Sequence, residues 1–131
     1  MLVRDTLPAI LWAWIIFVES SVPGSKVPST PLGFDKLVHF FIFFVFCWLT
    51  FRATGALSPK FVPWMRVYLA LVITVLYGFT DEFHQLYVPG RTADMYDMAA
   101  DSLGGIFFVG LAIVGRKKIK STTDTNVNKT L

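Results

Sequence analysis

The chain of 131 residues is long enough for one domain, and 54% of its residues are hydrophobic while only 16% are charged. An ordinary soluble domain carries about 25% charged residues, whereas this chain has 13 phenylalanines, 4 tryptophans and a mean hydropathy of +0.58. The composition predicts a surface that faces lipid, and the scattered net charge of +3 argues against a nucleic-acid partner. A single cysteine, Cys47, excludes a disulfide framework and a cysteine metal site.

The first apolar run covers residues 7–18 and predicts a membrane helix over about 5–20. A cleaved signal peptide is the alternative, because the run is short and Arg4 precedes it. Three further apolar runs follow, and residues 20–23 form a poor cleavage site, so a retained helix is the favoured interpretation. Residues 21–34 are rich in proline and glycine, which predicts a loop.

The three remaining apolar runs predict membrane helices over about 36–54, 64–87 and 95–115. None of their uncharged cores reaches the ~20 residues of a full span, so each helix is long enough only with its polar end included. We therefore expect charged side chains inside the membrane boundary, shielded by neighbouring helices or by a water-filled cleft. A soluble helical bundle is the alternative. The polar tail at 117–131 is expected to be disordered.

The basic residues predict how the helices are oriented, because they favour the cytoplasmic side. Nine of them fall on one side of a four-helix arrangement: Arg4, Arg52, Lys60, Arg66, Arg116, Lys117, Lys118, Lys120 and Lys129. Only Lys26, Lys36 and Arg91 fall on the other. The sequence thus predicts an all-α integral-membrane bundle of four transmembrane helices over residues 1–116, with both termini in the cytoplasm.

The stretch from Tyr77 to Gly105 holds five of the nine acids, and apolar segments flank it on both sides. Charge is costly next to hydrocarbon and tends to mark function there. At the start of the second helix, Asp35 and His39 are four residues apart, so the carboxylate could orient the imidazole. A histidine that is simply hydrogen-bonded within the core is the alternative.

At the end of the third helix, helical spacing allows Gln85 to meet both Asp81 and Glu82. Asp81 could instead pair with His84, three residues on. The two neighbouring acids point about 100° apart around the helix, which suggests different roles. Ordinary solvated charge at a helix end is the alternative.

Residues 88–91, Val-Pro-Gly-Arg, predict a tight turn that brings Arg91 close to the acids before it. The planar guanidinium suits a carboxylate or a phosphate, because it donates two parallel hydrogen bonds. Arg91 is therefore either a clamp for an anionic ligand or half of a structural pair with a carboxylate.

On the fourth helix, Asp94, Asp97 and Asp101 form one stripe, and Gly104 and Gly105 continue near it one turn deeper. Small residues let a neighbouring helix approach closely, so these acids should face the bundle rather than lipid. Asp101 is the deepest acid, and an unpaired carboxyl group there would tend to stay protonated. A protonated carboxyl can act as a general acid or donate a hydrogen bond.

The order of these motifs resembles the VanZ-like family over roughly residues 10–112. The matching motifs are Ser20-Ser21-x-Pro23, Asp35-Lys36-x-x-His39, Tyr77-Gly78-x-x-Asp81-Glu82-x-x-Gln85, Pro89-Gly90-Arg91, Asp97 and Ser102-x-Gly104. The resemblance carries over Asp35, Lys36, His39, Glu82, Gln85, Arg91 and Asp97. The chain departs from the family at Asp101, where many members carry asparagine; Asp101 would have to be protonated to donate the same hydrogen bond.

The resemblance implies a small multi-pass protein of the bacterial cytoplasmic membrane. The founding member of the family is associated with low-level resistance to teicoplanin, a lipoglycopeptide antibiotic that acts outside the membrane. Its relatives are mostly small bacterial membrane proteins without an assigned reaction. Kinship alone does not make this chain a resistance protein.

Three functions fit this pattern. The first is an enzyme acting on a lipid or lipid-linked envelope substrate at the extracytoplasmic face, with His39 as base and Glu82 or Asp97 as acid or metal ligand. The residues expected to bind substrate are Asp35, Lys36, Asp81, Gln85, Arg91 and Asp101. The second is a non-enzymatic binder of an envelope lipid or lipoglycopeptide, and the third is a structural polar network. The sequence specifies neither a cofactor nor a metal, although His39, Glu82 and Asp97 could hold a divalent ion.

Overall fold

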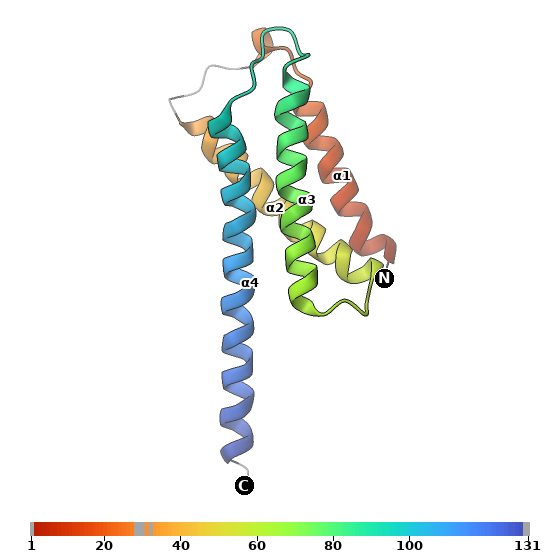
Figure 1. The fold of residues 1–131 in the computed structure, drawn as a ribbon, viewed down its shortest axis with the longest axis vertical. Helices are drawn as coiled ribbons and strands as arrows, with labels where there is room; N and C mark the ends of the chain where they lie inside the picture. Colours follow the sequence, from red (N-terminus) through yellow and green to blue (C-terminus); the bar gives the residue numbers. More distant parts are fainter. Residues whose placement is uncertain (1, 28–30, 32, 130–131) are drawn as a thin grey trace.

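The computed structural model describes residues 2–27, 31 and 33–129, with side chains as far as Arg116. Its elements are α1 (Leu2–Ser20), the short 3₁₀ turn η1 (Gly24–Lys26), α2 (Phe34–Leu57), α3 (Pro63–Gln85) and α4 (Met95–Lys129). The prediction of an all-α fold with four long helices is confirmed (Figure 1).

Among the residues that the structure describes, three segments are long and apolar enough to cross a membrane, namely α2, α3 and the Met95–Arg116 part of α4. The protein is therefore a multi-pass membrane protein by the composition of its helices. α1 is 19 residues long, but it falls outside this group because it contains Arg4, Asp5 and Glu19.

The helix boundaries follow from local chemistry. Pro63 begins α3, where its missing N–H costs no helical hydrogen bond. Gly33, with φ of 85°, precedes α2, and Gly90, with φ of 75°, turns the chain after α3. The side chain of Asp94 accepts a hydrogen bond of 2.8 Å from the backbone N–H of Tyr96 and so caps the start of α4.

α4 is longer than predicted, because its backbone remains helical to Lys129 rather than ending near residue 115. Residues 116–129 contain neither proline nor glycine, so nothing in this part of the sequence breaks the helix. The side chains from residue 117 onward, where a disordered tail is predicted, lie outside the part that the structure describes.

α2 lies at the centre of the bundle and contacts all three other long helices. Its buried Phe43 packs with Ile16 of α1, and Cys47 packs with Ala70 of α3 and Phe108 of α4. Two side chains also bond to the backbone of a neighbouring helix. Trp12 Nε1 donates to the carbonyl of Ile42 over 3.0 Å, and the Tyr77 hydroxyl donates to the carbonyl of Ala13 over 2.7 Å.

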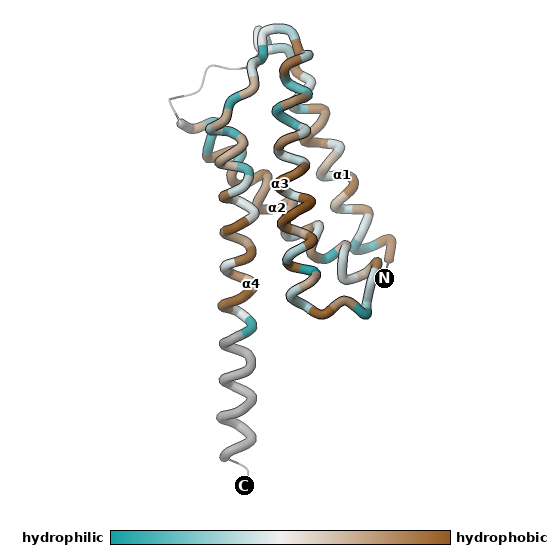
Figure 2. The backbone as a smooth tube through the Cα atoms, in the orientation of Figure 1, coloured by the Kyte–Doolittle hydropathy of each residue, from teal (hydrophilic) through white to brown (hydrophobic). Residues whose placement is uncertain are grey.

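The outside of the bundle is apolar around most of its height. Large hydrophobic side chains such as Ile10, Phe41, Leu76 and Phe107 are exposed on four different helices. In Figure 2 the hydrophobic positions are concentrated along the middle of the helices, and hydrophilic positions occur at both ends of the bundle. This arrangement is that of a protein solvated by lipid.

Both termini lie at one end of the bundle, and the α1–α2 and α3–α4 connections meet at the other (Figure 1). These connections touch, since the backbone N–H of Gly24 donates to the carbonyl of Pro89 over 3.0 Å. A Cβ atom at Gly24 would lie 1.8 Å from the Gly90 oxygen, so only glycine permits this approach. At the end that holds the termini, Arg52 pairs with Asp5 and links α2 to α1.

The glycine stripe of α4 yields a prediction for stability. A Cβ atom at Gly104 would lie 2.2 Å from the carbonyl oxygen of Phe40, so Gly104→Ala must push α4 away from α2. Such overpacking costs about 1–3 kcal/mol, and the melting temperature in detergent should fall. The control is Gly110→Ala on the same helix, where nothing lies within 4 Å of an added Cβ. Equal melting temperatures for the two variants would contradict this packing.

Candidate functional site

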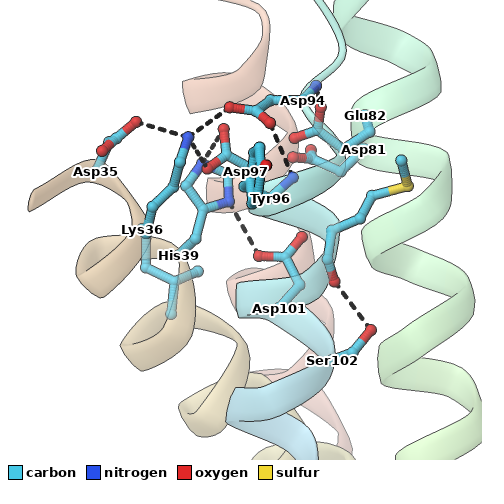
Figure 3. Close-up of polar contacts among 12 residues, drawn as sticks. Asp35, Lys36, His39, Asp81, Glu82, Asp94, Tyr96, Asp97, Asp101 and Ser102 are labelled. Atoms are coloured by element: carbon cyan, nitrogen blue, oxygen red, sulfur yellow. Dashed lines mark hydrogen bonds and ion pairs between the residues drawn. The ribbon is translucent and has the colours of Figure 1, made fainter. Parts of the chain in front are cut away.

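Acidic and basic side chains from three helices meet at the end of the bundle where the loops join (Figure 3). Lys36, in the first turn of α2, is the hub of this cluster. Its Nζ lies 2.9 Å from Asp35, 2.5 Å from Asp94 and 2.7 Å from Asp97. Since Asp94 precedes α4 and Asp97 lies in its first turn, one ammonium group ties the start of α2 to the start of α4.

Asp94 both caps α4 and pairs with Lys36, so its carboxylate has two partners. The Lys36 ammonium holds the pKa of Asp94 below its usual range, because its hydrogen bond favours the charged form. The sequence predicts that Asp94 belongs to the acidic stripe of α4. It does not predict the contact of Asp94 with Lys36, because the two residues are 58 apart in the chain.

His39 lies one turn deeper than Lys36 and is held by α4. Its Nδ1 shares a hydrogen bond of 2.9 Å with Oδ1 of Asp101, and its Nε2 lies 3.9 Å from Oδ2 of Asp97. The predicted pair between Asp35 and His39 is absent from the described part of the structure. Asp35 pairs with Lys36 instead, and the imidazole of His39 pairs with Asp101. Asp101, which the sequence places as the deepest acid of α4, has a partner and orients the ring.

Glu82 is 1% exposed and belongs to the same cluster. Its Oε2 accepts a hydrogen bond of 2.7 Å from the backbone N–H of Asp94, which links α3 to the start of α4. Gln85 donates to Asp81 over 3.3 Å and lies 3.5 Å from Glu82, as the helical spacing predicts. His84 does not pair with Asp81; its Nε2 lies 3.0 Å from the hydroxyl of Ser21.

Three of these side chains form a compact set of nitrogen and oxygen donors. His39, Glu82 and Asp97 each offer an atom that lies within 4.8 Å of those of the other two. Each residue comes from a different helix, so the set exists only in the packed bundle. A neutral imidazole and two carboxylates suit divalent cations such as Mn²⁺ or Zn²⁺. We refer to these three residues as the polar centre.

Arg91 occupies a different position from the one expected. Its Nε donates to the carbonyl of Val22 over 3.1 Å, and an Nη donates to the carbonyl of Glu19 over 3.3 Å. No ion pair links it to a carboxylate in the described residues. The guanidinium therefore binds backbone carbonyl groups at and just beyond the end of α1, and it holds that end against the α3–α4 connection.

A cavity of about 220 Å³ adjoins the polar centre and shares His39 with it. Its polar lining residues are Glu19, Ser20, Asp35, His39, Asp81, Gln85 and Arg91. Its apolar lining residues are Ile16, Val27, Phe34, Val38, Ile42 and Phe43. The cavity thus has both a polar and an apolar wall, built from α1, α2, α3 and the two connections.

The structure thus divides the predicted site residues into three groups. The cluster around Lys36 and His39 contains Asp35, Lys36, His39, Glu82, Asp97 and Asp101. Asp81 and Gln85 line the cavity instead, and Arg91 lines it while binding the end of α1. Sequence reasoning gave little weight to Ser20, which also lines the cavity and whose only signal is the Ser-Ser-x-Pro motif.

Comparison with known proteins confirms the resemblance found in the sequence. Residues 6–116 match the family model described as VanZ/LLP1. An uncharacterized protein of the fission yeast Schizosaccharomyces pombe is 30% identical over 110 residues, which cover 83% of this chain. The matched region spans only 65% of that relative's own length. No solved structure matches the chain.

The hub role of Lys36 can be tested by its removal. Lys36→Met leaves three carboxylates without their shared cation, and because most of these groups are partly exposed the loss costs about 1 kcal/mol in the free energy of unfolding. Adding Asp97→Asn to this variant should restore part of the loss, because it removes one uncompensated charge. The control is Lys26→Met, an exposed lysine at the same end of the bundle. If both single variants melt alike in detergent, Lys36 does not hold the helices together.

Proposed function

The chain belongs to the VanZ/LLP1 family, and from this premise we propose that it is a membrane enzyme acting on a lipid or lipid-linked substrate. The observation that carries the proposal is the convergence of His39, Glu82 and Asp97 from three helices onto one small volume. Ionisable groups inside the membrane boundary are costly, and they are commonly kept for function. The adjoining cavity gives a lipid-like molecule a place beside these groups.

The proposed chemistry is hydrolysis or group transfer at an ester bond. His39 acts as the base, because its hydrogen bond to Asp101 fixes the ring and leaves Nε2 facing Asp97. Glu82 and Asp97 supply the acid or hold a divalent cation. In hydrolysis, His39 takes a proton from water, the water oxygen bonds to the acyl carbon or phosphorus, and the leaving oxygen receives a proton.

We also propose that α1 is a fourth span and that both termini face the cytosol. Nine of the basic residues lie at the end that holds the termini or in the tail. The polar centre then faces away from the cytosol; in a bacterium this is the outer side of the cytoplasmic membrane. A similar protein occurs in fission yeast, a eukaryote, so proteins like this chain are not confined to bacteria.

A non-enzymatic binder of an envelope lipid or lipoglycopeptide is the second candidate. The favouring observation is that Lys36 and Arg91 already have protein partners on several sides. Because both cations are held by other residues of the protein, the network is more typical of a rigid binding site than of a catalytic site whose charged groups must interact with a reacting substrate. Binding without any product would support this candidate.

The orientation can be tested by labelling introduced cysteines in intact cells or sealed vesicles. The native Cys47 is fully buried, so it should not react with a membrane-impermeant maleimide. Lys26→Cys, in the α1–α2 connection, should be labelled from the non-cytosolic side, whereas Lys60→Cys, in the α2–α3 connection, should be protected until the membrane is opened. If only Lys60→Cys is labelled from the non-cytosolic side, the orientation is the opposite of the one proposed.

The catalytic proposal predicts loss of turnover without loss of fold. Purified protein is incubated with a total lipid extract of its host membrane, and products are identified by mass spectrometry. Because the proton-transfer groups are removed, His39→Ala and Glu82→Gln should lower turnover at least about 100-fold, in line with the contribution of general acid–base catalysis. The matched control is His84→Ala, the other histidine at this end of the bundle, which lies outside the polar centre.

Turnover is compared only between variants whose melting temperature equals that of the native protein, so that a folding defect is not mistaken for a catalytic defect. Turnover that persists in both His39→Ala and Glu82→Gln would remove the enzyme hypothesis. Absence of any product with the native protein, together with saturable lipid binding, would favour the binder.

A further inference from the structure

The cavity beside the polar centre contains a buried hydroxyl group that makes no hydrogen bond of normal length. Ser20 is 4% exposed and lines the cavity, and among the described residues its Oγ has only a longer, weaker contact with the carboxyl group of Asp81. A buried polar group without a good hydrogen bond is costly, because it has lost its bonds to water. A ligand group that bonds to Ser20 would remove this cost.

The polar wall around Ser20 consists mostly of hydrogen-bond acceptors. Asp81 and Gln85 are both buried and line the cavity with it, and Glu19 and Asp35 add two more carboxyl groups. The one guanidinium of the wall, Arg91, is occupied by backbone carbonyl groups. This wall therefore favours a ligand that donates hydrogen bonds, such as one with hydroxyl groups, and it disfavours a phosphate or carboxylate head group.

The apolar wall continues from this polar wall towards the outside of the bundle. Ile16 and Phe43 are buried at the inner end, whereas Phe34 is 51% exposed and Val27 is 40% exposed. The two exposed side chains therefore form an apolar rim where the cavity meets its surroundings. This rim offers the chain of an entering lipid an apolar surface to contact.

The size of the cavity limits what it holds. A cavity of about 150 Å³ accommodates benzene, and pockets for drug-sized ligands begin near 300 Å³. A volume of about 220 Å³ therefore takes a small head group and the first carbons of one chain, while the remainder of the chain stays in the bilayer. The first carbons of a second chain on the same head group add volume, so we expect a lipid with two chains to bind more weakly.

We propose that this cavity binds the hydroxylated head group and the adjoining carbons of an uncharged single-chain lipid of the monoacylglycerol class. His39 belongs both to the cavity wall and to the polar centre, so the ester group of such a lipid lies next to the proposed base. As a statement about the substrate, this inference rests on the proposed function. Hydrolysis would add water across the ester, release a fatty acid and return a proton to the glycerol oxygen.

Binding is measured on the full chain in detergent by native mass spectrometry, with 1-oleoylglycerol as the probe. Lysophosphatidic acid tests the charge of the head group, and 1,2-dioleoylglycerol tests the number of chains. We expect both to bind at least about tenfold more weakly than 1-oleoylglycerol, because of repulsion by the carboxyl groups and lack of room respectively. Equal or tighter binding of either comparison lipid overturns the proposal.

Two variants, each with a control, test whether 1-oleoylglycerol binds in this cavity. Ser20→Ala should weaken binding of 1-oleoylglycerol by about fivefold, the effect of one lost hydrogen bond. Its matched control is Ser102→Ala, whose hydroxyl bonds to the backbone of its own helix. Ile42→Trp should abolish binding by filling the cavity, and Ile10→Trp on the exposed face of α1 should not. If Ile42→Trp does not fold, the comparison of the two serine variants decides; unchanged binding in Ser20→Ala overturns the proposal.

Failure of this inference and failure of the proposed enzyme are distinguishable. Binding of 1-oleoylglycerol that persists in Glu82→Gln, with no fatty acid released by the native protein, keeps the binding site and rejects the reaction. Turnover of other lipids by the native protein, with no saturable binding of 1-oleoylglycerol, rejects the cavity proposal and keeps the enzyme.

Discussion

The structure depends on the requirement that charged groups inside a membrane boundary find partners in the protein. Lys36 meets this requirement for three carboxylates at once, and Asp101 meets it for His39. Apart from the pair of Lys36 with its neighbour Asp35, each of these contacts joins α2 to α4 or to Asp94, the residue before α4. The same contacts that offset the cost of the charges therefore also fix the relative positions of the helices.

Close helix packing is what makes these contacts possible. Gly104 brings the backbone of α4 against the backbone of α2 near Phe40, one residue after His39. At this separation Asp101, on the adjacent turn of α4, reaches the imidazole. Glu82 of α3 joins the same region through the backbone N–H of Asp94. The polar centre and the cavity are thus consequences of how the four helices and two connections pack.

Much of this arrangement can be read from the sequence, and the unpredicted part has a common physical cause. Apolar runs predict the four helices, and the spacing within α3 predicts the contact of Gln85 with Asp81, because both depend only on helical geometry. The partner of His39 is not predictable in this way, since Asp101 lies 62 residues away and meets it only after α2 and α4 have packed. Arg91 illustrates the same limit, because its partners are the backbone carbonyl groups of Glu19 and Val22, about 70 residues away, rather than the acids nearby in sequence.

The central claim is that the imidazole of His39, on α2, lies close to carboxylates from α3 and α4. The most direct measurement is the ¹⁵N NMR spectrum of the histidine side chains in the full-length protein. The ring nitrogens of His39 should shift in Asp101→Asn, Asp97→Asn and Glu82→Gln, and should not shift in Asp5→Asn, whose carboxylate pairs with Arg52 at the other end of the bundle. Signals of His39 that stay unchanged in all three variants would show that these helices do not converge on one centre.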